Sequence, residues 1–339
     1  VPAYAAKAPP APRGHRTRGS WLSGKTMYEF MRARVDALGI PVQQQTAVRR
    51  LITDASGAVI GAETLGLAVD TPAGQRHLKW MRRAESLHNI MPGRADKLRA
   101  RARALMLEQG EVRHVRARSG VLLSTGGFIF NTDLVRQHAT KYTMTMRLGA
   151  TGCDGSGLRL GETVGGTAAR LDKVSAWRFI NPPTVWPRGV VVSADGRRFC
   201  NEQVYGARLG VEMCDHADGR AWLILDRKLR RTAIKETLFG KLWFFQSVPA
   251  FFLMLFAPRA RTLEKLAERI GVPAGALRAT VADYNAGANG EKPDSLGKST
   301  DMLASLDTPP YYAMDVSAGS KTFPCPAITL GGLRVDEDS

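Results

Sequence analysis

Two adjacent glycines, Gly126 and Gly127, follow closely after the apolar run Val121–Leu123. Such a run is typical of a strand that is covered on both faces, and we expect a strand over residues 120–124. Because glycine has no Cβ, the backbone of the loop that follows could approach a phosphate or a ribose to hydrogen-bonding distance. Thr125 and the glycine pair therefore predict a loop that contacts a cofactor, with an ordinary turn as the alternative.

Further segments with chemical potential follow this loop in a fixed order. Asn131 and the glycine-rich loop Gly149–Gly157 come next, and an Asn-Glu pair ends the segment Asp195–Glu202. Two helical segments, Thr262–Gly271 and Ala274–Asn285, joined at Val272-Pro273, lie further on. In this order, the segments resemble the FAD-dependent oxidoreductase family of fumarate reductase, the succinate dehydrogenase flavoprotein and 3-ketosteroid dehydrogenase. The order of the motifs is more specific than any one of them.

The resemblance implies an α/β fold, in which a Rossmann-like flavin-binding domain carries an inserted α+β capping domain. It places a partial FAD-binding domain at residues 1–165, with a basic helical insertion at 66–112, and the capping domain at 166–315. Residues 316–339 would return to the flavin domain. The GxGxxG turn near the amino terminus and the carboxyl-terminal flavin segment of the family have no counterpart in the sequence. We therefore interpret the chain as a fragment of a longer flavoprotein.

The resemblance also implies contacts to FAD. Ala47 and Val48 would present backbone groups to the adenine. Thr125, Gly126 and Gly127 would lie along the adenosine and pyrophosphate, with Asp154 close by. Ordinary turn and strand chemistry is the alternative for these positions.

The residues expected at the catalytic site differ from those of the fumarate reductases. Four residues after Glu202, where those enzymes carry an acid arginine, this chain has Gly206, and the segment before Thr329 contains no histidine. Fumarate is therefore not the expected substrate. The ketosteroid dehydrogenases carry a tyrosine after the Asn-Glu pair, and here Tyr205 stands one residue early, with a packed tyrosine of the cap as the alternative.

Three groups of residues complete the predicted catalytic and substrate-binding set. Tyr205 is the first candidate to move a proton, and Arg208 would help its phenol to ionise, because a phenol has a pKa of about 10. Tyr312 is a further catalytic candidate. The predicted substrate-binding positions are Thr329, Gly331 and Gly332.

The predicted function is that of an FAD-dependent dehydrogenase or ene-reductase acting on CH–CH groups. It would transfer hydride between flavin N5 and a small, apolar, steroid-like ketone, with an electron acceptor that the sequence does not identify. A P-loop protein is the rival class, because Gly19–Thr26 matches the letters GxxxxGK[ST]. A working P-loop is entered from a buried parallel strand, whereas Pro9–Arg18 is polar and interrupted by prolines, so a helix start is favoured.

The formal net charge of +17 is concentrated in one block. From Arg76 to Arg118 there are twelve Lys or Arg residues and four Asp or Glu residues. The block lacks the signature of a nucleic-acid-binding motif, so a solvated helical insertion is favoured over a nucleic-acid-binding or membrane-surface module. The four cysteines are scattered, which favours a reducing, cytoplasmic compartment and no metal site.

The most apolar segment is Leu242–Ala257, a run of sixteen residues that contains Pro249. A membrane-spanning helix needs about 20 such residues, so we expect no span here. Basic residues on both sides of the segment suit a peripheral membrane contact. A buried lid or substrate-access helix is the favoured alternative.

Local periodicity predicts further elements. Apolar residues at steps of three and four predict a helix from about Lys25 to Gly39, and Asp54–Gly57 is typical of a turn between two strands. Residues 131–147 and 156–165 are predicted to be helical.

Overall fold

The computed structural model describes residues 17, 23–181, 183–240, 242 and 244–337. Within these residues the chain forms two compact units, which meet in sequence at Leu122 and Leu123. We call the part up to Leu122 the N-terminal unit and the part from Leu123 onward the C-terminal unit. The domain boundaries predicted at residues 165 and 315 do not coincide with this division and stay a prediction.

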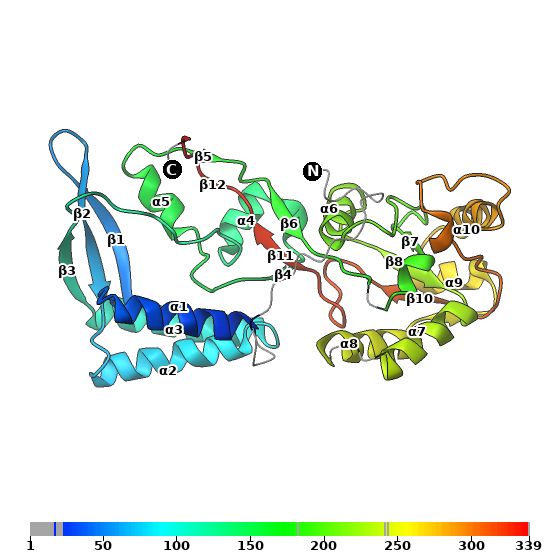
Figure 1. The fold of residues 1–339 in the computed structure, drawn as a ribbon, viewed down its shortest axis with the longest axis horizontal. Coiled ribbons are helices and arrows are strands. Elements are labelled where there is room, and N and C mark those ends of the chain that lie inside the picture. The colour runs from blue at the N-terminus through cyan, green and yellow to red at the C-terminus, as the bar shows by residue number, and fades with distance from the viewer. Residues whose placement is uncertain (1–16, 18–22, 182, 241, 243, 338–339) are drawn as a thin grey trace. The chain divides into compact units, whose positions relative to one another are not determined.

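The N-terminal unit combines three helices with a three-stranded sheet (Figure 1). Its elements are α1 (Ser23–Ala37), β1 (Thr46–Thr53), β2 (Val59–Gly66), α2 (Pro72–Leu87), α3 (Pro92–Gln109) and β3 (Glu111–Arg116).

The sheet of the N-terminal unit is an antiparallel meander in the order β1-β2-β3. The turn between β1 and β2 forms because the Asp54 carboxylate accepts hydrogen bonds from the amides of Ser56 and Ala58, at 2.8 and 3.1 Å. This confirms the predicted turn at Asp54–Gly57. The helices α2 and α3 are inserted between β2 and β3, which pair with each other directly.

Helix starts in the N-terminal unit follow their sequence signals. The Thr71 hydroxyl accepts a hydrogen bond from the amide of Gly74, and Pro72 occupies the first turn of α2, where no amide is needed. Helix α1 contains Gly24, Lys25 and Thr26 in its first turn, as the helix-start interpretation predicts. The rest of the P-loop match, Gly19–Leu22, lies outside the described residues.

The C-terminal unit is larger and contains three sheets and a set of helices. Its first elements are α4 (Thr132–His138), η2 (Thr140–Tyr142), β4 (Met146–Arg147), α5 (Ser156–Glu162), β5 (Ala168–Ala169), β6 (Val174–Ala176), η3 (Trp186–Arg188), β7 (Val190–Val192) and α6 (Gly206–His216). The remaining elements are β8 (Trp222–Leu225), α7 (Arg227–Phe239), α8 (Phe244–Leu255), β9 (Arg259–Ala260), α9 (Leu263–Ile270), α10 (Ala274–Ala288), η4 (Thr300–Met302), β10 (Tyr311–Asp315), β11 (Pro326–Thr329) and β12 (Gly332–Leu333).

The cap is built around the antiparallel sheet β7-β8-β10-β9. The middle of β8 is fully buried, since Leu223, Ile224 and Leu225 expose none of their surface. Helices α7 to α10 contact this sheet or one another (Figure 1). The remaining sheets are β4-β11-β6, in which β11 runs parallel to β4, and the pair β12-β5.

Two predicted elements differ from the structure. Residues 120–124 form no strand, and the side chain of Leu122 is 91% exposed. A strand exists only when a neighbour pairs with its backbone, and no described residue pairs with this segment, so the expected strand was wrong for this structure. The predicted helix at 131–147 is shorter, because α4 ends at His138 and β4 begins at Met146.

Candidate functional site

The Gly126-Gly127 loop packs tightly against two other parts of the C-terminal unit. Gly126 has a φ of +78°, and a Cβ there would lie 2.7 Å from the sulfur of Cys153. A Cβ on Gly127 would lie 2.2 Å from the hydroxyl oxygen of Thr329. Only glycine fits both positions without displacing a neighbour.

Hydrogen bonds hold the three segments together. The Thr329 hydroxyl accepts from the amide of Phe128 at 2.9 Å, across 201 residues of sequence. The carbonyl of Gly127 accepts from the amide of Gly155 at 3.1 Å, and Asn131 donates to the carbonyl of Asp154 at 3.0 Å. The structure thus brings together four predicted site positions: Gly126, Gly127, Asp154 and Thr329.

The loop also carries backbone groups available to a ligand. The amides from Ser124 to Gly127 donate to no acceptor within the described part of the chain, and Ser124, Thr125 and Gly126 are exposed. Backbone amides are strong donors that require partners, and phosphate or ribose oxygens are suitable acceptors. The residues present therefore fit the pyrophosphate and ribose of FAD.

Of the other predicted binding positions, Ala47 and Val48 belong to the N-terminal unit, and Gly331 and Gly332 follow Thr329 in the C-terminal unit. Ala47 and Val48 stand at the start of β1, where a register shift between Val48 and Arg50 marks a bulge. A Cβ on Gly331 would lie 2.2 Å from the carbonyl oxygen of Arg170, whereas Gly332 faces open space. The binding roles of these positions stay predictions.

Tyr205 precedes the first residue of α6 and is 49% exposed. Its ring meets that of Phe179 edge to face, with 5.5 Å between the centroids. A Cβ on Gly206 would lie 2.4 Å from the Phe179 ring, so the glycine allows Phe179 to sit against the start of α6. Tyr205 is thus fixed at its ring while part of its surface remains accessible.

Arg208 and Tyr312 are held by other partners. The guanidinium of Arg208 pairs with the carboxylate of Glu212, one turn further along α6. Tyr312 is buried in β10, and the guanidinium of Arg230 lies 4.4 Å from its ring centroid. Their catalytic roles stay predictions; in the structure Arg208 forms an ion pair and Tyr312 packs in the core.

The glutamate of the Asn-Glu pair belongs to a buried ion cluster, which we define as Arg198, Glu202, Asp294 and Lys298. Glu202 accepts from Arg198 at 2.7 and 3.0 Å, from Lys298 at 2.9 Å and from the amide of Val191 at 3.0 Å. Asp294 accepts from Arg198 at 2.6 Å. Burial opposes ionisation of Glu202, but the charges of Lys298 and Arg198 outweigh it and hold its pKa below the usual range.

The ion cluster positions the segment that leads to Tyr205. Asn201 donates to the carbonyl of Leu296 at 3.3 Å, and Gln203 exchanges hydrogen bonds with Ser299 at 2.6 Å each way. The Asn-Glu pair therefore supports the chain just before α6.

Sequence reasoning missed Arg178, which is 1% exposed. Its guanidinium donates to the carbonyls of Phe323 and Ser317 at 2.7 and 2.9 Å, and burial lowers its pKa. Arg178 thus connects the segment that contains Phe179 to the chain that leads into β11. The guanidinium of Arg178 also lies 4.8 Å from the ring centroid of Phe323, a contact that no local sequence pattern could have indicated.

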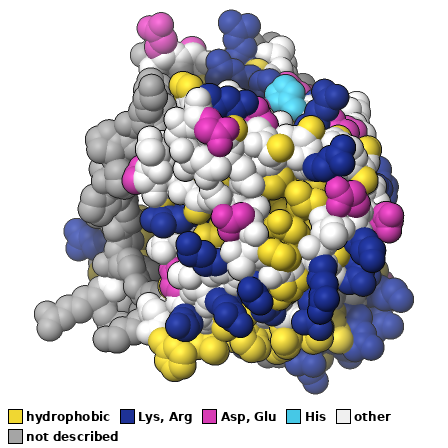
Figure 2. Space-filling model, turned by 90° about the vertical axis from the view of Figure 1, so that its right-hand side faces the viewer, with side chains coloured by type: hydrophobic (Ala, Val, Ile, Leu, Met, Phe, Trp, Pro, Cys, Tyr) yellow, Lys and Arg dark blue, Asp and Glu magenta, His cyan; other side chains and the backbone are white. Residues whose placement is uncertain are grey.

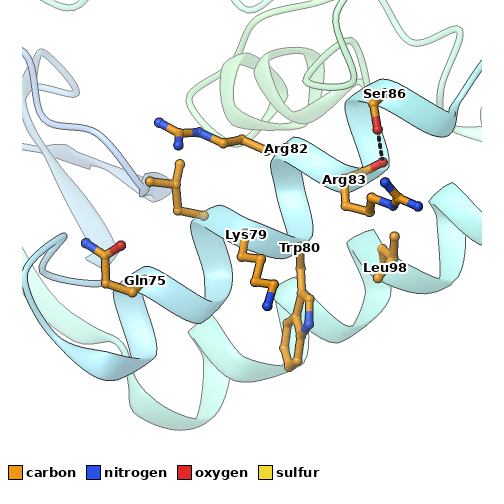
Figure 3. Close-up of a pocket in the computed structure, with 8 residues that line it drawn as sticks. Gln75, Lys79, Trp80, Arg82, Arg83, Ser86 and Leu98 are labelled. Atoms are coloured by element: carbon orange, nitrogen blue, oxygen red, sulfur yellow. Dashed lines mark hydrogen bonds between the residues drawn. The ribbon is translucent and has the colours of Figure 1, made fainter.

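A shallow hollow of about 580 Å³ lies on the α2–α3 hairpin (Figure 3). Its lining combines apolar and basic side chains: Gln75, Leu78, Lys79, Trp80, Arg82, Arg83, Ser86 and Leu98. None of the predicted site residues lines it. The hollow is part of the basic insertion expected at residues 66–112.

The comparison with known protein families defines the class of this protein. The chain matches the family described as FAD binding domain over residues 5–339, and it belongs to this family. The predicted resemblance, the fold class and FAD as cofactor are thereby confirmed. No helix among the described residues has the length and apolar character to cross a bilayer.

The chain is similar in sequence to individual members of this family. The chain is 40% identical to the 3-oxo-5-alpha-steroid 4-dehydrogenase of Comamonas testosteroni, over 100% of this chain and 64% of that protein. It is 30% identical to the 3-oxosteroid 1-dehydrogenase of Mycobacterium tuberculosis, over 68% of this chain and 45% of that one.

Among solved structures, the chain resembles the 3-ketosteroid-delta4-(5alpha)-dehydrogenase of Rhodococcus jostii in complex with 4-androstene-3,17-dione. The TM-score is 0.69 at 24% identity, and the match covers 97% of this chain and 57% of the other. This likeness supports the fold. The chain thus spans less than two thirds of the length of each of these three relatives.

Proposed function

We propose that this chain is part of an FAD-dependent oxidoreductase that acts on a CH–CH bond of an apolar, steroid-like ketone. The family match and the name of the 40%-identical relative support this assignment. When bound, FAD supplies hydride transfer at its N5 atom. An electron acceptor and a cytoplasmic location are further parts of the proposal.

The observation that carries the proposal is the convergence of the Gly126-Gly127 loop with Thr329 and the turn at Cys153–Gly155. The amides of Thr125, Gly126 and Gly127 would bind oxygens of the pyrophosphate and ribose. Because the two glycines have no Cβ, the loop can pack closely against Cys153 and Thr329. Thr329 holds the loop through the amide of Phe128 and would also border the substrate, together with Gly331 and Gly332.

Tyr205 is proposed to move the proton that accompanies hydride transfer. The Phe179 ring packs against the ring of Tyr205, and the ion cluster holds Glu202, three residues earlier, while Tyr205 stays 49% exposed and accessible to a substrate. A positioned acid or base of this kind contributes about 100-fold or more to a rate.

The test is the Tyr205→Phe variant of the full-length protein. It should keep the flavin spectrum and the fold, because only one oxygen is removed. Flavin bleaching by a 3-ketosteroid, followed in anaerobic single turnover, should slow by about 100-fold, which corresponds to roughly 3 kcal/mol of transition-state stabilisation. Tyr28→Phe, at an exposed tyrosine of α1, is the matched control and should react at the wild-type rate.

If Tyr205→Phe is reduced at the wild-type rate, Tyr205 is a packing residue and the proton is moved by another group, such as Tyr312. If no 3-ketosteroid bleaches the wild-type flavin, the proposed substrate class is wrong.

A further inference from the structure

The hairpin formed by α7 and α8 exposes an apolar surface that the fold leaves uncovered. Phe239 is 80% exposed and Phe256 is 74% exposed. The exposed set, which we call the α7–α8 apolar ridge, consists of Leu238, Phe239, Val248, Phe252, Leu255 and Phe256. Large exposed apolar patches on a folded protein mark contact surfaces.

Helical spacing explains which face of α8 is exposed. Val248, Phe252 and Phe256 follow one another at intervals of four residues, and the rings of Phe252 and Phe256 stack with 6.1 Å between centroids. On the opposite face, Ala250 and Met254 are buried against the cap. The favoured expectation of a buried lid therefore describes only one face of this helix.

Helix α7 adds a row of cations to the same hairpin. Lys228, Arg231 and Lys235 recur at steps of three and four residues, and the same face continues into Leu238 and Phe239. The opposite face is buried through Leu229, Ala233 and Thr237.

The exposed charge of the hairpin is positive. The acidic residue of α7, Glu236, is engaged by the amide and hydroxyl of Thr184 at 2.8 and 3.0 Å. Lys228, Arg231 and Lys235 have no ion-pair partner in the described ranges, and Arg259 and Arg261, after α8, are also exposed. Figure 2 looks onto this side of the C-terminal unit and shows hydrophobic side chains gathered along its lower edge, with Lys and Arg side chains beside them.

We propose that the α7–α8 apolar ridge and its cation row dock this protein onto the surface of an anionic lipid bilayer. Apolar and aromatic side chains would insert at the level of the acyl boundary, and Lys228, Arg231 and Lys235 would contact acidic headgroups. A second copy of the chain fits less well, because a two-fold contact across this face would bring two cation rows together. The proposal does not depend on the activity proposed above.

The test is co-sedimentation of the full-length, flavin-loaded protein with phosphatidylcholine vesicles that contain about one third phosphatidylserine. The wild type should bind these vesicles, bind pure phosphatidylcholine much less, and dissociate as the salt concentration rises from about 0.1 to about 1 M. Phe239→Ser and Phe256→Ser should each weaken binding about tenfold, because each removes a ring from the apolar contact.

Lys235→Glu keeps the apolar ridge and changes the charge by two units. It should weaken binding about 25-fold, since each charge near an anionic bilayer changes the partition roughly fivefold. Ile90→Ser and Arg101→Glu, at exposed positions of the N-terminal unit, are the matched controls and should bind like the wild type. Thermal melting and flavin absorbance confirm that each variant is folded.

Four outcomes would overturn the proposal. The first is that the wild type does not bind the vesicles, and the second is that the ridge variants bind as well as the wild type. The third is that the control variants lose as much binding as the ridge variants. The fourth is that Phe239→Ser and Phe256→Ser lose flavin or melt at a lower temperature. The last result would mean that another part of the full-length chain covers the ridge. Self-association without lipid that the same variants abolish would instead assign the ridge to a second copy.

Discussion

The buried ion cluster makes a sharp prediction about Glu202. Glu202 is fully buried and accepts four hydrogen bonds, three of them from the cations Arg198 and Lys298. In Glu202→Gln, two buried cations would share one remaining carboxylate, that of Asp294. Breaking a buried ion pair on one side costs about 3–5 kcal/mol, because it leaves an uncompensated charge in a low-dielectric environment.

The stabilising effect of Glu202 should depend on pH. Because the pKa of Glu202 is lowered in the folded protein, its contribution is present above the unfolded pKa of about 4.5 and is lost as the pH falls from there through the lower pKa of the folded state. The stability difference between the wild type and Glu202→Gln should therefore be largest near neutral pH and should narrow below about pH 4.

The assay is urea unfolding of the full-length protein, followed by tryptophan fluorescence across this pH range. Adding Lys298→Met to Glu202→Gln removes the unpaired cation and should recover at least about 1 kcal/mol. The exposed pair of Glu264 with Arg278, whose charged atoms are 3.8 Å apart, provides the control, and Glu264→Gln should leave the midpoint unchanged. A Glu202→Gln variant as stable as the wild type at neutral pH would refute the assignment of a structural role to the Asn-Glu pair.

Two further predictions concern the glycine loop and the P-loop match. Gly127→Ala should lower the free energy of unfolding by about 2–4 kcal/mol, because its Cβ would displace the Thr329 hydroxyl and break the hydrogen bond from the amide of Phe128. Gly332 faces open space, so Gly332→Ala should have no effect on the melting temperature. Equal melting temperatures for the two variants would contradict the packing geometry. Lys25→Ala should leave ATP affinity and flavin reduction unchanged, because Lys25 lies in the first turn of α1 and contacts Glu29 at 3.7 Å; a loss of ATP binding, measured by calorimetry, would restore the P-loop interpretation.

Local patterns were sufficient to predict many of the elements. The helices α1, α9 and α10 and the turn at Asp54 follow from apolar spacing and from residues that end or cap an element, both of which act within a few positions along the chain. The order of motifs was also sufficient to recognise the flavoprotein family, which the family match confirms.

Tertiary structure decided how the candidate site is assembled. Gly127 meets Thr329 and Glu202 meets Lys298 only because sheet pairing brings distant segments together, and no local pattern encodes such contacts. The same reason explains the missing strand at residues 120–124, since an apolar run becomes a strand only where a neighbour supplies its hydrogen bonds. It also explains α8, whose sequence is mostly apolar but whose packing leaves one face exposed. The sequence determined which segments could form elements and carry chemistry, and long-range packing determined which of their side chains are buried, paired or left exposed.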